Sequence, residues 1–134
     1  MAFRLSKRVA ADLFEEEYII ANLETGLYYS LQGSGIFLLK NLPFASSSAV
    51  IEKFGKTFPD QQQEVIDNLN HIWQELEKEA IVELFDADLP ESELEFGNEF
   101  VASTLHSYAD MQDLLALDPI HEVDGSGWKK ENDK

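Results

Sequence analysis

The sequence has 134 residues, of which 44% are hydrophobic, and a formal net charge of −16. This length and hydrophobic content fit one packed core, since single domains commonly have about 100 to 150 residues. The absence of cysteine excludes disulfides and thiolate chemistry, and the acid excess disfavours nucleic acid, whose phosphates bind Lys and Arg. No apolar run reaches the roughly 18 residues that cross a bilayer, so we expect a cytoplasmic protein with no membrane partner.

The first 31 residues predict three strands. RVAADLF (8–14) and EYIIANLE (17–24) are short runs enriched in β-branched or aromatic residues, and LYYSL (27–31) continues the pattern. Between the last two runs, Gly26 supplies the positive φ that a hairpin turn needs. Alternation along 27–31 places the odd-numbered residues on the core and the even-numbered ones on a wetter face.

Three helices and a closing strand are expected next. Ser34 is the expected N-cap of an apolar helix over 36–42, because the Gly-Ser-Gly run around it lacks the spacing of a phosphate-binding loop. A serine in 46–48 caps the second helix, AVIEKFGKTF. Asp60 and the glutamine three residues later have the form of a capping box for the third helix, whose apolar stripe is Val65, Leu69, Ile72, Leu76 and Ala80. IVELF (81–85) is expected to return as a strand.

The remaining third of the chain is acidic. From Glu83 to Asp124 there are twelve acidic residues and no Lys or Arg. We divide the chain into a domain (1–85), an acidic linker (86–99) and a tail (100–134). Within the tail, one amphipathic helix is expected from the spacing of Val101, Leu105, Tyr108, Met111 and Leu115.

No catalytic or metal site is expected. His71 and His106 lie on separate predicted helices without an acidic or nucleophilic partner at a fixed spacing. His121 lies in an acidic stretch, for which a solvated loop is the favoured interpretation over a metal site. We therefore predict no enzyme, no cofactor and no metal.

The order of these segments resembles the PqqD-like proteins, also called RiPP recognition elements. The resemblance covers about residues 5 to 85 and rests on NLETG (22–26), YYSL (28–31), the apolar helix 36–42 and EAIV (79–82), where Ala80 replaces the usual glycine. It implies an α+β, winged helix-turn-helix fold that binds no DNA. Its three-stranded antiparallel sheet is followed by three helices, here with an acidic C-terminal extension.

The resemblance also implies a function. Family members bind the leader segment of a ribosomally synthesised precursor peptide as an extra strand beside the third strand and the third helix, and present it to a modifying enzyme. An open edge at 27–31 would accept such a strand by backbone pairing. We therefore expect a non-catalytic adaptor, with a homodimer by edge pairing as a further use of that edge. The residues that the resemblance assigns to peptide binding are Leu27, Tyr28, Tyr29, Ser30, Leu31, Glu64, Val65, Asn68, Leu69 and Ile72.

The tail allows an alternative. YADMQDLLALDPIHEVD (108–124), followed by Gly127-Trp128, is similar to an extension of some PqqD-like proteins and to leader-containing precursor-like peptides. On this hypothesis the chain is a precursor with its own fused recognition domain, and 100–134 is a leader and core or an enzyme-docking segment. A third hypothesis is a plain scaffold in which the tail packs permanently on the domain.

Overall fold

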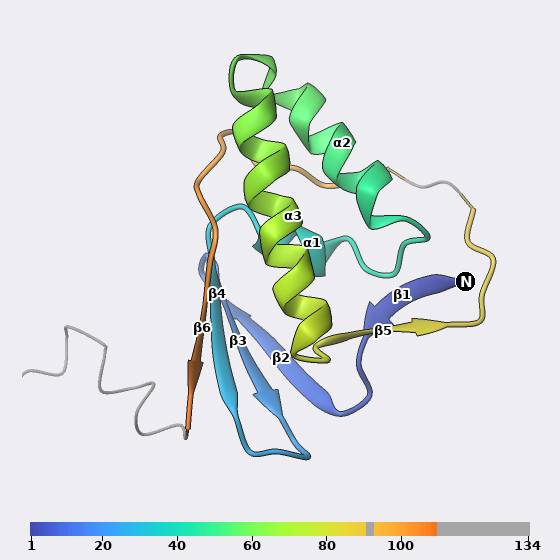
Figure 1. Cartoon of the computed structure of the whole chain (residues 1–134), viewed down its shortest axis with the longest axis vertical. Helices are drawn as coiled ribbons and strands as arrows, with labels where there is room; N and C mark the ends of the chain where they lie inside the picture. The colour runs from blue at the N-terminus through green and yellow to red at the C-terminus, as the bar shows by residue number, and fades with distance from the viewer. Residues whose placement is uncertain (91–92, 110–134) are drawn as a thin grey trace, which may run out of the picture.

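The computed structural model describes residues 1–90 and 93–109 (Figure 1). In this part the chain is of the α+β class, with antiparallel sheets and three α-helices. Figure 1 shows the sheet containing β2, β3, β4 and β6 at one side of the helices and the pair β1 and β5 at the other. The elements in chain order are β1 (Ala2–Leu5), β2 (Val9–Phe14), β3 (Glu17–Asn22), β4 (Tyr28–Gln32), α1 (Ile36–Lys40), α2 (Ser47–Thr57), the 3-10 helix η1 (Pro59–Gln61), α3 (Gln62–Lys78), β5 (Val82–Phe85) and β6 (Thr104–Tyr108).

Among the described residues, the main sheet has four strands in the order β2-β3-β4-β6, rather than the three expected. The three predicted strands form within a few residues of their expected bounds, and the fourth comes from the C-terminal part of the chain. Gly26 has φ 81° in the hairpin between β3 and β4, as expected. The Asn22 side chain fixes that turn, because its Oδ1 accepts from the N–H groups of Glu24 and Thr25.

A second, two-stranded sheet pairs the N-terminal strand β1 with β5. We predicted β5 but not β1. The ring of Phe3 in β1 lies edge-on to Trp73 of α3, 5.1 Å between centroids, and Phe44 lies 5.4 Å from the same indole. These aromatic contacts explain why so short a strand is held against the core.

Two of the three predicted helix caps are wrong. The residue at the N-cap of α1 is Gly35, which has no side chain with which to cap the helix. Asp60 lies in η1, and the N-cap residue of α3 is Gln61, also without a side-chain cap. The third prediction is confirmed, since Ser46 Oγ accepts from the Ala49 N–H at the start of α2. No helix in the described ranges is long and apolar enough to cross a membrane.

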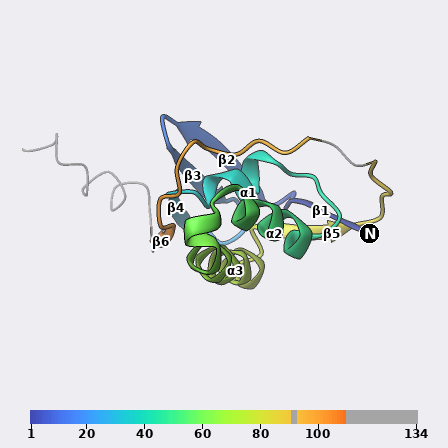
Figure 2. The ribbon, with the colours of Figure 1, turned by 90° about the horizontal axis from the view of Figure 1, so that it is seen from above.

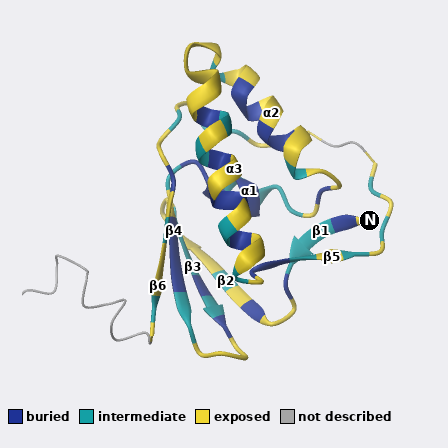
Figure 3. Ribbon diagram, in the orientation of Figure 1, coloured by how far each residue is buried: buried dark blue, intermediate teal, exposed yellow. Residues whose placement is uncertain are grey.

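The core lies between the inner face of the main sheet and the three helices, where the dark blue residues of Figure 3 gather. Sheet residues Ile20, Tyr29 and Leu31 meet helix residues such as Phe54 and Leu69 in one cluster. Four members of the predicted stripe of α3 are buried and confirm it, namely Val65, Leu69, Ile72 and Leu76. The fifth, Ala80, was wrongly included, because it is exposed and the helix ends at Lys78.

Ala80 lies beyond the end of α3 with φ 58°, a left-handed conformation that favours glycine. Its N–H donates to the Glu77 carbonyl and the Ile81 N–H donates to the Leu76 carbonyl. These two bonds are those of a Schellman motif. The helix therefore ends sharply even though alanine occupies the position.

Candidate functional site

The edge of β4, which we expected to be open, is occupied by β6 of the same chain. β6 pairs antiparallel with β4 from Gln32 opposite Thr104 to Tyr28 opposite Tyr108. The expectation of a vacant edge is therefore wrong. Figure 1 shows the orange segment crossing from one side of the molecule to the other and descending as β6 beside β4.

This pairing also corrects the predicted tail helix. Residues 104–108 are a strand, whereas Met111 and Leu115 of the predicted stripe lie outside the described residues. The β4 edge offers a row of backbone donors and acceptors, and a strand satisfies them while a helix does not. Tertiary pairing thus overrides the helical spacing of the apolar residues.

The side chains of β6 divide between the two faces of the sheet. Leu105 is opposite the buried Leu31 and packs against the core. Ser107, opposite the buried Tyr29, lies on the same face but is exposed, and Thr104 and His106 are exposed on the outer face. Tyr108 is opposite Tyr28, and both are half-buried. One aliphatic side chain and one tyrosine are therefore the main apolar contributions of the strand.

Just before β6, the chain passes over the Gly33-Ser34-Gly35 turn. The Ser34 N–H donates to the Val101 carbonyl, and the Val101 N–H donates to Ser34 Oγ, both at 2.8 Å. The Gly35 N–H donates to Ser103 Oγ at 2.6 Å. Ser34, expected to cap α1, instead holds the C-terminal segment.

Gly33 shows how close this approach is. It has φ 84°, and a Cβ placed on it would lie 2.4 Å from the Ala102 carbonyl oxygen and 2.7 Å from Ser103 Cα. No side chain fits in that space. The Gly-Ser-Gly run thus packs directly against the backbone of Ala102 and Ser103.

Asn68 of α3 forms the opposite wall. Its Oδ1 accepts from the Ser103 N–H at 2.8 Å, and its Nδ2 lies 3.4 Å from the Ser103 carbonyl oxygen. Ser103 is only 6% exposed, so this side chain satisfies a buried backbone donor. Residues 101–108 thus lie in a groove formed by the Gly-Ser-Gly turn, the edge of β4 and Asn68, which we call the β4–α3 groove.

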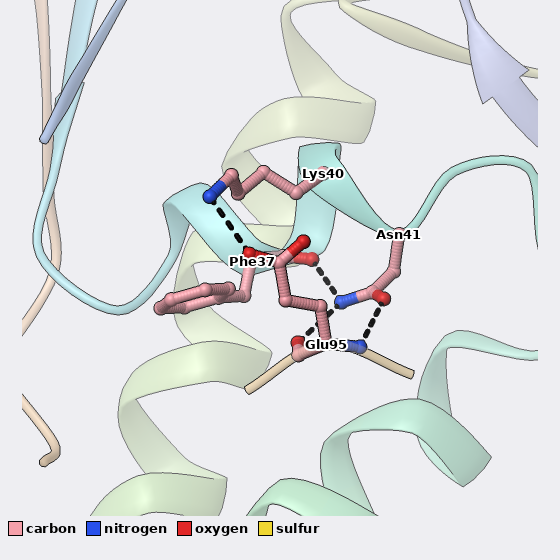
Figure 4. A network of polar contacts seen from close by, with 4 residues as sticks. All are labelled: Phe37, Lys40, Asn41 and Glu95. Atoms are coloured by element: carbon pink, nitrogen blue, oxygen red, sulfur yellow. Dashed lines mark hydrogen bonds and ion pairs between the residues drawn. The ribbon is translucent and has the colours of Figure 1, made fainter. Parts of the chain in front are cut away.

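Part of the segment expected to be a linker is also docked. Phe96 packs edge-on to Phe54 of α2 at 4.0 Å between ring centroids, and Leu94 and Phe100 also pack against the core. Figure 4 shows Asn41, at the end of α1, bound to the backbone of Glu95. In Figure 2, seen from above, this segment runs across the molecule toward β6.

The predicted peptide-binding residues divide into three groups. Tyr28, Tyr29, Ser30 and Leu31 all pair with β6, and Asn68 binds Ser103. Val65, Leu69 and Ile72 are buried in the core, and Glu64 is exposed in the first turn of α3. Leu27 lies outside the ladder, where its carbonyl accepts from the Asn22 N–H in the hairpin.

Ser30 departs from the expected alternation, because it is 2% exposed although it lies on the outer face. Its hydroxyl donates to the Glu17 carboxylate on the neighbouring strand. Tyr29 is buried as expected, and its hydroxyl donates to Glu79 at 3.0 Å. Burial, together with this hydrogen bond, raises the pKa of Tyr29 to about 12.

Sequence reasoning missed Gly33, Ser34, Asn41 and Ser103. A signal existed for the first two, since closely spaced glycines often mark a place where another backbone approaches. No local pattern reveals Asn41 or Ser103, because each acts on a residue more than 30 positions away in the sequence. Long-range pairing of this kind has no signature in a single sequence.

A pocket of about 820 Å³ lies beside the docked segment. Its walls include the acidic turn between β2 and β3, with Glu15 and Glu16, and the Glu99 region of the segment. Its lining holds four carboxylates, counting Glu17, against one ammonium, that of Lys40, and this excess of negative charge attracts cations and repels phosphates.

The two described histidines lie on different elements, His71 on α3 and His106 on β6, and the latter is a strand rather than the predicted helix. Within residues 1–90 and 93–109, no group of three His, Asp or Glu side chains has the arrangement to hold a metal ion. His121 falls outside the described residues. The geometry that stands out is therefore that of a groove holding an extended segment.

No protein-family model matches the chain, and comparisons with curated proteins and with solved structures also find no match.

Proposed function

We propose that this chain is a non-catalytic peptide-presenting protein that holds its own C-terminal segment in the β4–α3 groove. In this proposal, residues 1–85 are a recognition domain of the PqqD-like, winged helix-turn-helix type. Residues 101–108 are its ligand, bound in cis, and residues from 110 onward are offered to a peptide-modifying enzyme in the cytoplasm. The chain is then a precursor with its own fused recognition domain.

The observation that carries the proposal is the β4–β6 pairing. A strand added to a sheet edge is a recurring way in which proteins bind peptides, because backbone hydrogen bonds supply affinity and alternate side chains supply specificity. Here the added strand lies where the family resemblance places a leader peptide, beside β4 and the Asn68 face of α3. It also immediately precedes the stretch that resembles precursor-like peptides.

Binding in cis needs little intrinsic affinity. A tethered ligand experiences an effective concentration in the millimolar range for short linkers, so a weak ladder is still occupied. Only Leu105 and Tyr108 among the β6 side chains are half-buried. The strand is therefore held mainly by its backbone and by the contacts at Val101 and Ser103.

The test is co-expression of the chain with any peptide-modifying enzyme that its neighbouring genes encode, followed by intact mass measurement. We expect a mass change on residues 110–134 in the wild-type chain. Asn68→Ala removes the partner of the Ser103 N–H and should slow the modification. Asn70→Ala, an exposed change on the same helix, is the control. Equal modification rates for the two variants would mean that docking of residues 101–108 does not help to present the tail to the enzyme.

A second candidate function is the adaptor that captures a leader peptide in trans. The limited burial of β6 favours it, since Thr104, His106 and Ser107 are exposed and a strand with stronger apolar anchors has room to compete. It ranks second because β6 must first leave the edge. A leader peptide that displaces β6 would be detected as a gain in amide exchange at 104–108 of this chain when the peptide is added.

A further inference from the structure

Two asparagines bind the C-terminal segment in the same way at two separate places. Asn41 Oδ1 accepts from the Glu95 N–H at 2.7 Å, and its Nδ2 donates to the Glu95 carbonyl at 2.9 Å. Asn68 makes the equivalent pair with Ser103. A side-chain amide has one acceptor and one donor group, which match the two polar groups of a single residue in an extended chain.

These contacts do not depend on the side chain of the bound residue. Backbone N–H and C=O groups are present in every peptide, so each asparagine holds an extended segment in register without selecting its sequence. Selection must come from the neighbouring contacts. The surroundings of Asn41 supply them.

The neighbour of Glu95 is an aromatic anchor. The centroids of the Phe96 and Phe54 rings are 4.0 Å apart, with an interplanar angle of 87°, and Phe54 itself is buried in the C-terminal half of α2. Edge-to-face pairs of this kind add to the free energy of area burial. A small side chain in place of Phe96 would leave the face of Phe54 uncovered.

The next position favours a small residue, because a side chain there would displace the Phe37 ring by a few tenths of an ångström. A Cβ placed on Gly97 would lie 3.0 Å from Cε2 and 3.1 Å from Cζ of Phe37, a ring on α1. Such contacts are tighter than ordinary van der Waals contacts. The Phe37 ring is in turn approached by Lys40, whose Nζ is 5.2 Å from its centroid.

The same lysine selects for an acid. Lys40 Nζ lies 3.0 Å from Glu95 Oε2, as drawn in Figure 4. The Glu95 side chain is largely exposed, so the ion pair adds little affinity, but it disfavours a cation at that position. The surface thus fits the sequence acid-aromatic-glycine.

We propose that Phe37, Lys40, Asn41 and Phe54 form a second peptide subsite, which recognises an extended acid-aromatic-glycine sequence and acts together with the β4–α3 groove. Its occupant in this structure is Glu95-Phe96-Gly97. The ligand class of the recognition domain is accordingly a peptide that carries this tripeptide and, six residues after the glycine, a serine that fits beside Asn68. This inference rests on the proposed function, in which the domain binds peptides.

The test uses the full-length chain with its own ligand weakened by Phe96→Ala and Leu105→Ala, and a fluorescent synthetic peptide of residues 93–109. Fluorescence anisotropy gives the Kd. We expect the wild-type peptide to bind, and the same peptide with Phe96→Ala or Gly97→Val to bind about 10- to 100-fold more weakly, as for a central anchor. Adding Asn41→Ala to the host should weaken the wild-type peptide about tenfold, whereas adding Asn70→Ala should not.

The outcomes separate the two proposals. Equal binding of the wild-type and Phe96→Ala peptides overturns the second subsite but leaves the β4–α3 groove intact. Absence of binding by every peptide to a folded host overturns the capture of peptides in trans. Because the tethered segment binds at an effective concentration in the millimolar range, the subsite is then decided by amide exchange in the single variants below.

A host that does not fold is replaced by single substitutions in the otherwise wild-type chain. Asn41→Ala should then accelerate amide exchange at Glu95 about tenfold relative to Asn70→Ala, and an unchanged rate also overturns the subsite.

Discussion

The close approach of the C-terminal segment to the Gly-Ser-Gly turn predicts that Gly33→Ala releases β6. Gly33 and Gly26 have nearly the same left-handed backbone, with φ 84° and 81°. A Cβ on Gly26 meets no atom within 4 Å, whereas a Cβ on Gly33 collides with the backbone of residues 102 and 103. The two glycine-to-alanine substitutions therefore differ in one respect. Only Gly33→Ala places a side chain in the space that residues 102 and 103 occupy.

The magnitudes follow from this comparison. An alanine in the left-handed region lowers the free energy of unfolding by about 1 to 2 kcal/mol, and this cost is common to both variants. Gly33→Ala should in addition break the three short hydrogen bonds that Ser34 and Gly35 make to Val101 and Ser103. At about 0.5 to 1.5 kcal/mol each, these sum to about 1.5 to 4.5 kcal/mol. The extra loss corresponds to a factor of about 10 to 1000 in the docking equilibrium.

Hydrogen–deuterium exchange of the amides of residues 103–108 is the appropriate measurement, with urea unfolding to report global stability. We expect amide exchange in β6 to accelerate by a factor of about 10 to 1000 in Gly33→Ala and to change little in Gly26→Ala. Amide exchange in α3 should be similar in the two variants. Equal β6 exchange in both would refute the reasoning, because the collision would then have no effect on docking.

Three further predictions concern stability. Ala80→Gly should stabilise the chain by about 1 kcal/mol, because it relieves the left-handed alanine in the Schellman motif, and urea unfolding would show a higher midpoint. Tyr29→Phe should reduce alkaline destabilisation. The folded pKa of Tyr29 lies above its usual value of 10.0, so its contribution is complete below pH 10 and is lost as the pH rises toward 12. A stability profile over pH 8–12 that is the same in both proteins would contradict this. Phe54→Ala should cost about 3 to 5 kcal/mol, as for other buried phenylalanines, and should also expose Phe96, which proteolysis near 93–97 would detect.

The periodic parts of the fold were predictable from the sequence. The three strands and the buried face of α3 appear where alternation and the helical stripe place them, because local pattern and burial agree in these segments. The caps were less predictable. Ser34 and Asp60 have the right residue types for an N-cap, but Ser34 binds Val101 instead, and Asp60 lies in a 3-10 turn that precedes α3.

Of the candidate site, only the side formed by the domain itself was predictable. β4 and Asn68 were identified through the family resemblance, whereas residues 101–108, which occupy the groove, were assigned to a helix. Residues 104–108 form no pattern that reveals their partner, since they form a strand only against the edge made by residues 28–32. Secondary structure of this kind is a property of the pair and not of either segment.

The sequence order of β4 and β6 has a consequence for the nascent protein. β4 ends at Gln32 and its partner strand ends at Tyr108, so 76 residues, the difference between these two positions, are synthesised between them. At about 5 to 20 residues per second, the ribosome takes about 4 to 15 s to make that stretch. During this interval the emerging domain has an unpaired border, and any extended chain close to the ribosome has access to it before the protein's own strand arrives.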